Sequence, residues 1–387
     1  MKFFHLSLLL LLFAGCAPPP APPPVPPAPL EAKPLRLADF RELPMWQEST
    51  PAAALETFLN SCRAIARRDG WTQVCNEALF IASGDEQAAR RFFEEFFTPW
   101  QVVNEDGSRA GTITGYYAPE LAGSRVPDDT YKYPLYRPPD DLLTIDLAEI
   151  YPGLSDYRLR GRVEGNRVVP YFERGEIDGT ANPLAGNELF WVADPVDLFF
   201  LHIQGSGRIL LPDGEKVMLN YANQNGRPYR SIGKLLIERG AMSRDQMSMQ
   251  NIRSWVNANP EDGRKLLDEN PSYVFFQELE DGVESPLGAL GIPLAAERSL
   301  AVDPRTIPLG APVFLAASWP QTEEPLNRLM VAQDTGGAIK GRVRADFFWG
   351  MGADAGAQAG RMKQQGRLWV FLPKTFQAEP RVGLSKP

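Results

Sequence analysis

Three aspartates in the C-terminal quarter of the chain, Asp303, Asp334 and Asp346, could carry acid–base chemistry. Asp346 has the strongest case, because its neighbours from 345 to 349 are all alanine or aromatic residues. Apolar surroundings desolvate a carboxyl group and raise its pKa, so the group can hold a proton near neutral pH. We therefore interpret Asp346 as a general acid. The alternative is a strand-end aspartate that points to water.

Asp334 is the candidate helper, and it precedes the turn residues Thr335, Gly336 and Gly337. If it is ionised and close, its charge raises the pKa of Asp346 and stabilises developing positive charge. Alternatively, its side chain caps the turn. The sequence leaves both interpretations open. Asp303 precedes a proline in a proline-rich turn, which favours a structural role over a catalytic one.

Other catalytic chemistry has few candidates. The chain has only two histidines, and His5 lies in the apolar N-terminal segment, so His202 alone remains. A multi-histidine zinc site is therefore excluded, and a Ser-His-Asp arrangement has one possible base. The formal charge is −8, from 40 basic and 48 acidic residues without long blocks, so nothing indicates nucleic-acid binding. We expect carboxylate chemistry that needs no metal or cofactor.

The N-terminus is typical of an exported lipoprotein. Residues 1–16 contain a lysine, a short apolar run and small residues before Cys16, which we expect to be lipidated. A cleaved signal without lipid is the alternative. Residues 17–34 are rich in Pro and Ala and predict an extended tether. Residue 17 is Ala rather than Asp, so the inner-membrane retention signal of bacterial lipoproteins is absent. We expect a lipid anchor on the periplasmic face of the outer membrane of a Gram-negative bacterium.

Two further cysteines, Cys62 and Cys75, are an even pair that could form a disulfide in an oxidising compartment. Cys62 also lies on an apolar helical stripe with Leu55, Phe58 and Ile65, so two buried free thiols are the alternative. The pattern slightly favours the bridge.

Helices and strands are expected in alternating blocks. Helical periodicity covers the stripe around residue 58, the phenylalanines at 92–97, and residues 228–239 and 260–268, and a capping box at Ser243 predicts a further helix start. Short strands are predicted at 112–117, 158–163, 167–172, 189–192, 198–203, 273–277, 312–317, 329–333, 345–349 and 368–372. Strands in two blocks, with helices between and before them, predict two β modules.

Six short motifs stand out as a set. The C-terminal motifs run from Ala301 to Gly310, from Asp334 to Gly341 and from Asp346 to Phe348. The upstream motifs are Thr114-Gly115-Tyr116-Tyr117, Gln204-Gly205-Ser206-Gly207 and Asn223-Gln224-Asn225-Gly226-Arg227-Pro228-Tyr229. Together they resemble the motifs of the membrane-bound lytic transglycosylase A family, and the resemblance covers the whole mature domain.

The resemblance implies a mainly β fold with helices, namely a double-psi β-barrel related to barwin-like and endoglucanase barrels, plus a second inserted β-domain. The expected domains are a barrel at 35–121 and 206–375, with the three-aspartate region at 300–372, an insert at 122–205 and a tail at 376–387. The implied substrate is peptidoglycan. The implied reaction cleaves the MurNAc-β-1,4-GlcNAc bond and leaves 1,6-anhydro-MurNAc ends, with the aspartate at the position of Asp346 as the catalytic acid.

Substrate-binding candidates lie in or near these motifs. Tyr116, Tyr117, Tyr221 and Trp349 could stack on sugar faces, although each residue taken singly is more often part of a core. Gln204, Ser206 and Gln224 could bind N-acetyl groups, and Lys340 could bind a peptide-stem carboxylate or remain a solvated lysine. Thr114 and Gly115 belong to the upstream motif, and Gly336 and Gly337 suit either a tight turn or a close approach to sugar.

Two other functions remain open. An inverting hydrolase on the same barrel would use Asp346 as acid and Asp334 as base. A non-catalytic wall-binding barrel would bind peptidoglycan without cleaving it. The expected partners are glycan strands, outer-membrane lipid through Cys16, and other proteins of cell-wall synthesis or division.

Overall fold

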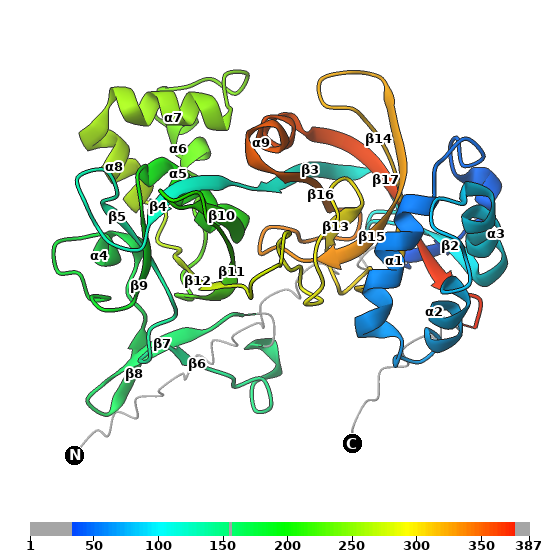
Figure 1. Cartoon of the computed structure of the whole chain (residues 1–387), viewed down its shortest axis with the longest axis horizontal. Helices are drawn as coiled ribbons and strands as arrows, with labels where there is room; N and C mark the ends of the chain where they lie inside the picture. The colour runs from blue at the N-terminus through cyan, green and yellow to red at the C-terminus, as the bar shows by residue number, and fades with distance from the viewer. Residues whose placement is uncertain (1–32, 155–156, 376–387) are drawn as a thin grey trace, which may run out of the picture. The chain divides into compact units, whose positions relative to one another are not determined.

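The computed structural model describes residues 33–154 and 157–375, and its described part is mainly β with helices (Figure 1), as predicted. The predicted signal, Cys16, most of the tether and the tail from 376 lie outside the described residues. The strands form an eight-stranded, a six-stranded and a three-stranded sheet.

The eight-stranded sheet contains all three aspartate regions. Its strand order is β1-β2-β17-β14-β15-β13-β16-β3, and β17 also pairs with β3. Each of β3, β13, β14, β15, β16 and β17 therefore pairs with two others of this set. The bounds are β1 Leu35–Leu37, β2 Phe97–Val102, β3 Gly111–Ala118, β13 Ser299–Val302, β14 Pro312–Ser318, β15 Pro325–Asp334, β16 Ala345–Met351 and β17 Lys363–Pro373.

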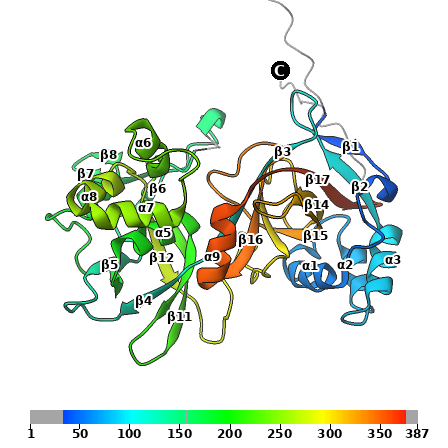
Figure 2. The same cartoon turned by 90° about the horizontal axis from the view of Figure 1, so that it is seen from above.

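Three N-terminal helices and α9 pack against this sheet. The helices are α1 (Ala52–Ile65), α2 (Thr72–Ala78), α3 (Glu86–Phe96) and α9 (Gly352–Arg361), and a short 3₁₀ turn, η1, spans Phe40–Glu42. The predicted stripe of α1 is buried with Val313, Phe314 and Leu368 of the sheet in one core. In both views α9 lies beside β3 and β16 (Figure 2), and its Gly356 approaches the ring of Tyr117.

The bridge between Cys62 and Cys75 is present and joins α1 to α2, with the two Cα atoms 5.6 Å apart. The predicted disulfide is therefore confirmed, and the alternative of two buried free thiols is wrong. A cross-link of this kind limits the conformations of the unfolded chain and stabilises the fold by roughly 3 kcal/mol.

The six-stranded sheet is larger than the predicted insert at 122–205. Its order is β12-β11-β10-β4-β9-β5, with bounds β4 Glu120–Ser124, β5 Tyr133–Tyr136, β9 Glu188–Val192, β10 Ser206–Leu210, β11 Lys216–Gln224 and β12 Val274–Glu278. The last three strands lie in the range expected for the barrel domain, 206–375. They pair within this sheet, because β10 pairs in parallel with β4 and antiparallel with β11, which in turn pairs with β12.

The predicted strand at 198–203 is wrong, because these residues lie in helix α5 (Pro195–Gln204). Asp194 accepts hydrogen bonds from the Val196 and Asp197 amides, and Pro195 occupies the first turn. Gly205 ends the helix with a φ of 78°. A continuous apolar run fits a buried helix or a buried strand, so the start and stop signals decide between them.

Three helices follow β11, and two of their starts differ from prediction. They are α6 (Ile232–Glu238), α7 (Met249–Ala258) and α8 (Pro260–Asp268). Ser243 and Gln246 form a turn, and α7 begins later, where the Ser248 hydroxyl accepts a hydrogen bond from the Asn251 amide. Likewise α6 begins after Ser231 rather than at residue 228. A second serine close to Ser243 explains the shift of α7, whereas α6 begins where the Ser231 hydroxyl accepts a hydrogen bond from the Lys234 amide. Helix α8 has the predicted bounds.

A small three-stranded sheet and a short helix complete the described fold. The sheet contains β6 (Leu143–Thr144), β7 (Arg160–Glu164) and β8 (Arg167–Pro170), followed by α4 (Arg174–Ile177), and a 3₁₀ turn, η2, spans Pro152–Leu154. Its β7 strand packs on the chain at Gly226, where a Cβ atom would lie 2.8 Å from the Arg160 Cβ. Gly226 also has a φ of 78°, so this close contact specifically requires glycine.

Candidate active site

Strand pairing places Asp334 and Asp346 on either side of one small residue. Ala301 of β13 pairs with Asp334 of β15 on one side and with Asp346 of β16 on the other. On the far side of β16, Asp346 pairs with Thr114 of β3. Neighbouring strands lie about 4.8 Å apart, so these residues form a row across the sheet, with the two aspartate backbones roughly 10 Å apart. Sheet register brings together residues that are far apart in the sequence.

Asp346 has the protonation behaviour of an acid. Its side chain is half-buried, and burial raises the pKa of its carboxyl to about 6. The Thr114 Oγ1 hydroxyl donates a hydrogen bond to Asp346 Oδ1 at 2.6 Å, and this bond and the charge of Arg344 hold the pKa lower than burial alone would. The charge of Asp334 raises that pKa further.

Arg344 is a site residue that the sequence pattern does not reveal, because the neighbours of Asp346 from 345 to 349 are alanine or aromatic residues. Arg344 Nη2 donates to Thr114 Oγ1 at 2.8 Å, so the guanidinium reaches the acid through the threonine hydroxyl. Its position two residues before Asp346 was visible in the sequence. The intervening Thr114, more than 200 residues away, was not a predictable link.

Asp334 caps its turn and also raises the pKa of Asp346, so the two interpretations of its role are compatible. Its Oδ1 accepts hydrogen bonds from the Thr335 amide at 2.9 Å and the Ala289 amide at 3.0 Å. Its Oδ2 accepts one from the Tyr116 hydroxyl at 3.0 Å. Burial raises the pKa of Asp334, and these hydrogen bonds oppose that rise.

Asp303 has a different environment that fits the structural role. Its carboxylate accepts two side-chain hydrogen bonds from Arg305 and one from the Gly341 amide at 2.9 Å. These bonds, led by those from Arg305, lower the pKa of Asp303 to about 2. Because Gly341 lies between Asp334 and Asp346 in sequence, Asp303 holds the loop that connects them.

Three of the four aromatic candidates are core residues rather than sugar platforms. Tyr116, Tyr117 and Trp349 are each at most 8% exposed. The Trp349 ring packs against Phe347, with 4.6 Å between centroids. Tyr221 is half-buried on β11 and remains available as a binding candidate.

Glycines near the site have unequal roles. A Cβ atom on Gly115 would lie 2.5 Å from the Trp349 Nε1, so Gly115 permits packing rather than substrate contact. On Gly336 it would lie 2.7 Å from the Ile339 side chain, whereas on Gly337 it would meet no atom within 4 Å. Gly337 and Lys340 are exposed, so both remain candidates for contact with a ligand.

Of the three candidates for binding N-acetyl groups, Gln204 and Ser206 have structural contacts or are buried. The Gln204 Oε1 accepts a hydrogen bond from the Tyr117 amide at 3.1 Å, and Ser206 is buried at the start of β10. Gln224 is half-buried. Its neighbour Asn225 is buried, donates to the Phe172 and Pro271 carbonyls and accepts from the Tyr273 amide, so this residue of the motif has a structural function.

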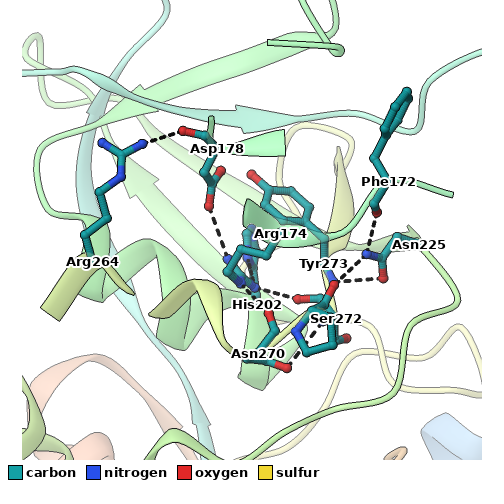
Figure 3. A network of polar contacts seen from close by, with 10 residues as sticks. Phe172, Arg174, Asp178, His202, Asn225, Arg264, Asn270, Ser272 and Tyr273 are labelled. Carbon is teal, nitrogen blue, oxygen red and sulfur yellow. Dashed lines mark hydrogen bonds and ion pairs between the residues drawn. The ribbon is translucent and has the colours of Figure 1, made fainter. Parts of the chain in front are cut away.

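A second titratable cluster surrounds His202 in α5. Arg174 is buried and its Nη2 lies 3.0 Å from His202 Nδ1, while its Nη1 forms an ion pair with Asp178 at 3.7 Å (Figure 3). Burial and the charge of Arg174 lower the pKa of His202 well below its usual value, so the ring is neutral. Burial also raises the pKa of Asp178 to about 6. His202 is therefore a core residue and not a base for a serine nucleophile.

Within residues 33–154 and 157–375, no group of three or more His, Cys, Asp or Glu side chains could hold a metal ion. Among the helices of that same part of the chain, none is both long and apolar enough to cross a membrane.

Two models of known families match the chain between residues 112 and 372. A family model described as the MltA specific insert domain matches residues 112–277. A second model, the 3D domain, matches residues 298–372. The first match includes all of the six-stranded sheet except its last residue, Glu278, and the second includes all three aspartates.

Individual relatives agree with these matches. Membrane-bound lytic murein transglycosylase A of Escherichia coli K12 is 35% identical over 299 residues, which cover 75% of this chain and 72% of the relative. The same enzyme of Vibrio cholerae is also 35% identical, over 68% of this chain and 66% of that relative.

Solved structures are similar over most of the chain. The monoclinic crystal structure of MltA from Neisseria gonorrhoeae is 38% identical, with a TM-score of 0.78, over 92% of this chain and 99% of that chain. E. coli MltA with bound chitohexaose is 30% identical, with a TM-score of 0.61, over 84% of this chain and 90% of that chain.

Proposed function

Because the chain belongs to the membrane-bound lytic murein transglycosylase A family, we propose that it cleaves peptidoglycan between MurNAc and GlcNAc and leaves 1,6-anhydro-MurNAc ends. The observation that carries this proposal is the half-buried Asp346, whose pKa is raised to about 6. Such a carboxyl keeps its proton at mildly acidic pH. Its position in the motif-bearing sheet, beside Asp334 and Thr114, supports its assignment as the catalytic acid.

The reaction requires one proton transfer in each direction. Asp346 donates its proton to the glycosidic oxygen, the bond from that oxygen to C1 of MurNAc breaks, and positive charge develops at C1. The C6 hydroxyl of the same sugar then attacks C1 and loses its proton to the ionised Asp346, which restores the acid. The attack is intramolecular, so it gains from proximity and needs neither water nor a carboxylate nucleophile.

Asp334 assists this cycle through its charge. Ionised Asp334 raises the pKa of Asp346, and its negative charge stabilises the cationic centre as it develops. Both Asp334 oxygens already accept hydrogen bonds from Tyr116 and from two backbone amides. That arrangement disfavours the alternative of an inverting hydrolase, in which Asp334 would have to take a proton from water.

Substrate contacts are proposed at the residues that the fold leaves accessible. These are Tyr221 for stacking, Gln224 for an N-acetyl group, and Gly337 and Lys340 on the exposed loop between the two aspartates. The buried Tyr116, Tyr117 and Trp349 would act behind the site by holding Asp334 and the β3 and β16 strands in place.

The remaining architecture and location are part of the same proposal. In the eight-stranded sheet, the pairings among β3, β13, β14, β15, β16 and β17 support the double-psi arrangement. The separate six-stranded sheet, which ends with β12, supports an insert that extends to about residue 278. The word membrane-bound in the relatives' names and the residues before Cys16 support a lipid anchor in the outer membrane. Replacement of Cys16 by Ala should release the protein without loss of activity.

Mass spectrometry of the products from purified sacculi tests the function. The proposal predicts muropeptides that end in 1,6-anhydro-MurNAc. Reducing MurNAc ends would instead indicate the hydrolase, and binding to sacculi without soluble products would indicate the wall-binding barrel.

A further inference from the structure

Arg344 donates hydrogen bonds to the Thr114 side chain, which contacts Asp346, and to backbone carbonyls of β3 and β16. Its half-buried guanidinium donates from Nη1 to the Thr112 carbonyl at 3.2 Å and to the Ala345 carbonyl at 2.5 Å. From Nη2 it donates to Thr114 Oγ1 at 2.8 Å. These contacts fix the side chain between the start of β16 and β3, on the same side of Asp346 as Thr114.

The direction of the next hydrogen bond follows from the donor inventory. An arginine has only donors, and a threonine hydroxyl has one proton. Because Thr114 Oγ1 accepts from Arg344, its own proton is directed at its other close partner, Asp346 Oδ1, at 2.6 Å. In the reverse arrangement Asp346 would donate to Thr114, and the threonine proton would then have no acceptor among the described residues.

We propose that Arg344 and Thr114 are positioning residues that keep Oδ1 of Asp346 as an acceptor and thereby place the catalytic proton on Oδ2. This inference rests on the proposed role of Asp346 as the acid. One carboxyl oxygen is fixed by the protein, and the other is presented to the glycosidic oxygen. After transfer, the same hydrogen bond and the charge of Arg344 stabilise the ionised carboxylate until it recovers the proton of the C6 hydroxyl.

Four single variants test this proposal, together with the double variant that combines Thr114→Val and Arg344→Gln. Thr114→Val removes the hydroxyl but keeps the shape, and Thr114→Ser restores a hydroxyl. Arg344→Gln removes the charge. Arg90→Gln is the matched control, because Arg90 also donates to two backbone carbonyls, those of Trp46 and Ser49, away from the acid. Release of anhydro-muropeptides is followed from pH 4.5 to 8, with a thermal melt of each variant.

The proposal predicts a loss in kcat and a shift in the pH profile. Misplacing a catalytic proton costs roughly 10–100-fold, so Thr114→Val and Arg344→Gln should each lose that much. Both groups lower the pKa of Asp346, so the pH at which activity declines should rise in both variants. Thr114→Ser should keep the wild-type profile. Because Arg344 acts through Thr114, the double variant should lose little more kcat than Thr114→Val alone.

Other outcomes would overturn it. If Arg344→Gln behaves like Arg90→Gln, with a lower melting temperature and an unmoved pH profile, Arg344 has only a structural function. If the kcat losses of Thr114→Val and Arg344→Gln multiply in the double variant, the two residues act independently. A wild-type protein that releases no anhydro-muropeptides would instead contradict the proposed function, which is a separate result.

Discussion

Asp346 and Asp178 have similar titration behaviour in two different surroundings. Each is a half-buried aspartate whose pKa burial raises to about 6. Each has an arginine nearby, Arg344 or Arg174, whose own pKa burial lowers. A raised pKa is therefore not enough to identify a catalytic acid in this molecule.

The contacts between carboxyl and arginine separate the two sites. Asp178 forms a direct ion pair with Arg174 (Figure 3). The Arg174 guanidinium carbon also lies 4.8 Å from the centroid of the Phe199 ring and 4.9 Å from that of Tyr273. At Asp346 a threonine hydroxyl lies between the carboxyl and Arg344. This difference in contacts, rather than the raised pKa, supports a structural role for Asp178 and the proposed acid role for Asp346.

The largest expected effect is on Asp346→Asn. Asparagine keeps the shape but has no carboxylic proton, and general acid–base catalysis contributes roughly 10²–10⁴-fold. Since one residue serves both proton transfers, the loss of anhydro-muropeptide release should reach about 10⁴-fold or more, with binding to sacculi and the melting curve retained. A variant within tenfold of wild type, combined with an inactive Asp334→Asn, would show that Asp334 is the acid.

Asp334→Asn should have a smaller effect on the same assay. Loss of its charge lowers the pKa of Asp346, so activity should decline at a lower pH than in wild type. At pH 5 the rate should fall by less than about 100-fold, because a helper that tunes the acid is not the proton donor. A pH profile that moves upward would contradict this electrostatic role.

Asp303→Asn should affect stability more than catalysis. The pKa of Asp303 is lowered to about 2, so its contribution to the free energy of unfolding is present above the ordinary value near 3.8 and is lost as pH falls through about 2. Hydrogen bonds to a charged group contribute about 1.5–3 kcal/mol, and the exposure of Arg305 reduces this, so roughly 1–2 kcal/mol is expected. Urea unfolding at pH 7 and pH 3 measures it; an equal difference at both values would contradict the linkage.

Asp178→Asn should have the smallest effect on activity, within about threefold of wild type, because Asp178 contacts Arg174, Arg264 and Tyr273 rather than the residues around Asp346. Its stability should change with pH in the opposite sense to Asp303. Because the folded-state pKa of Asp178 is raised, its stabilising contribution is present below 3.8 and is lost as pH rises through about 6. Melting temperatures at pH 4 and 7.5 should therefore favour the variant increasingly as pH rises.

The sequence was most informative where chemistry depends on local neighbours. Most strands and the apolar neighbours of Asp346 were predictable, because short-range patterns encode them. The contacts of Asp303 with Arg305 and Gly341 are consistent with the structural role expected of it. The row from Asp334 through Ala301 to Asp346 depends on strand register, which joins three separate segments. No local pattern specifies that register.

The misplaced aromatics show the same limit from another side. Tyr116 lies in, and Trp349 lies directly after, a motif that suits a sugar site, yet both are buried in the protein. Whether a side chain of a strand faces the core or a ligand is decided by what packs on that face. Here the Trp349 ring packs on Phe347 and Trp319 and lies against Gly115, and the Tyr116 hydroxyl donates a hydrogen bond to Asp334.

The pH dependence of kcat, measured in parallel for wild type and Asp178→Asn, tests the central distinction most directly. If Asp346 is the acid, kcat should decline as pH rises through about 6 in both proteins, with coincident profiles. If the decline disappears or moves in Asp178→Asn, the titration belongs to the Arg174 cluster, and the assignment of the acid to Asp346 by its raised pKa is contradicted.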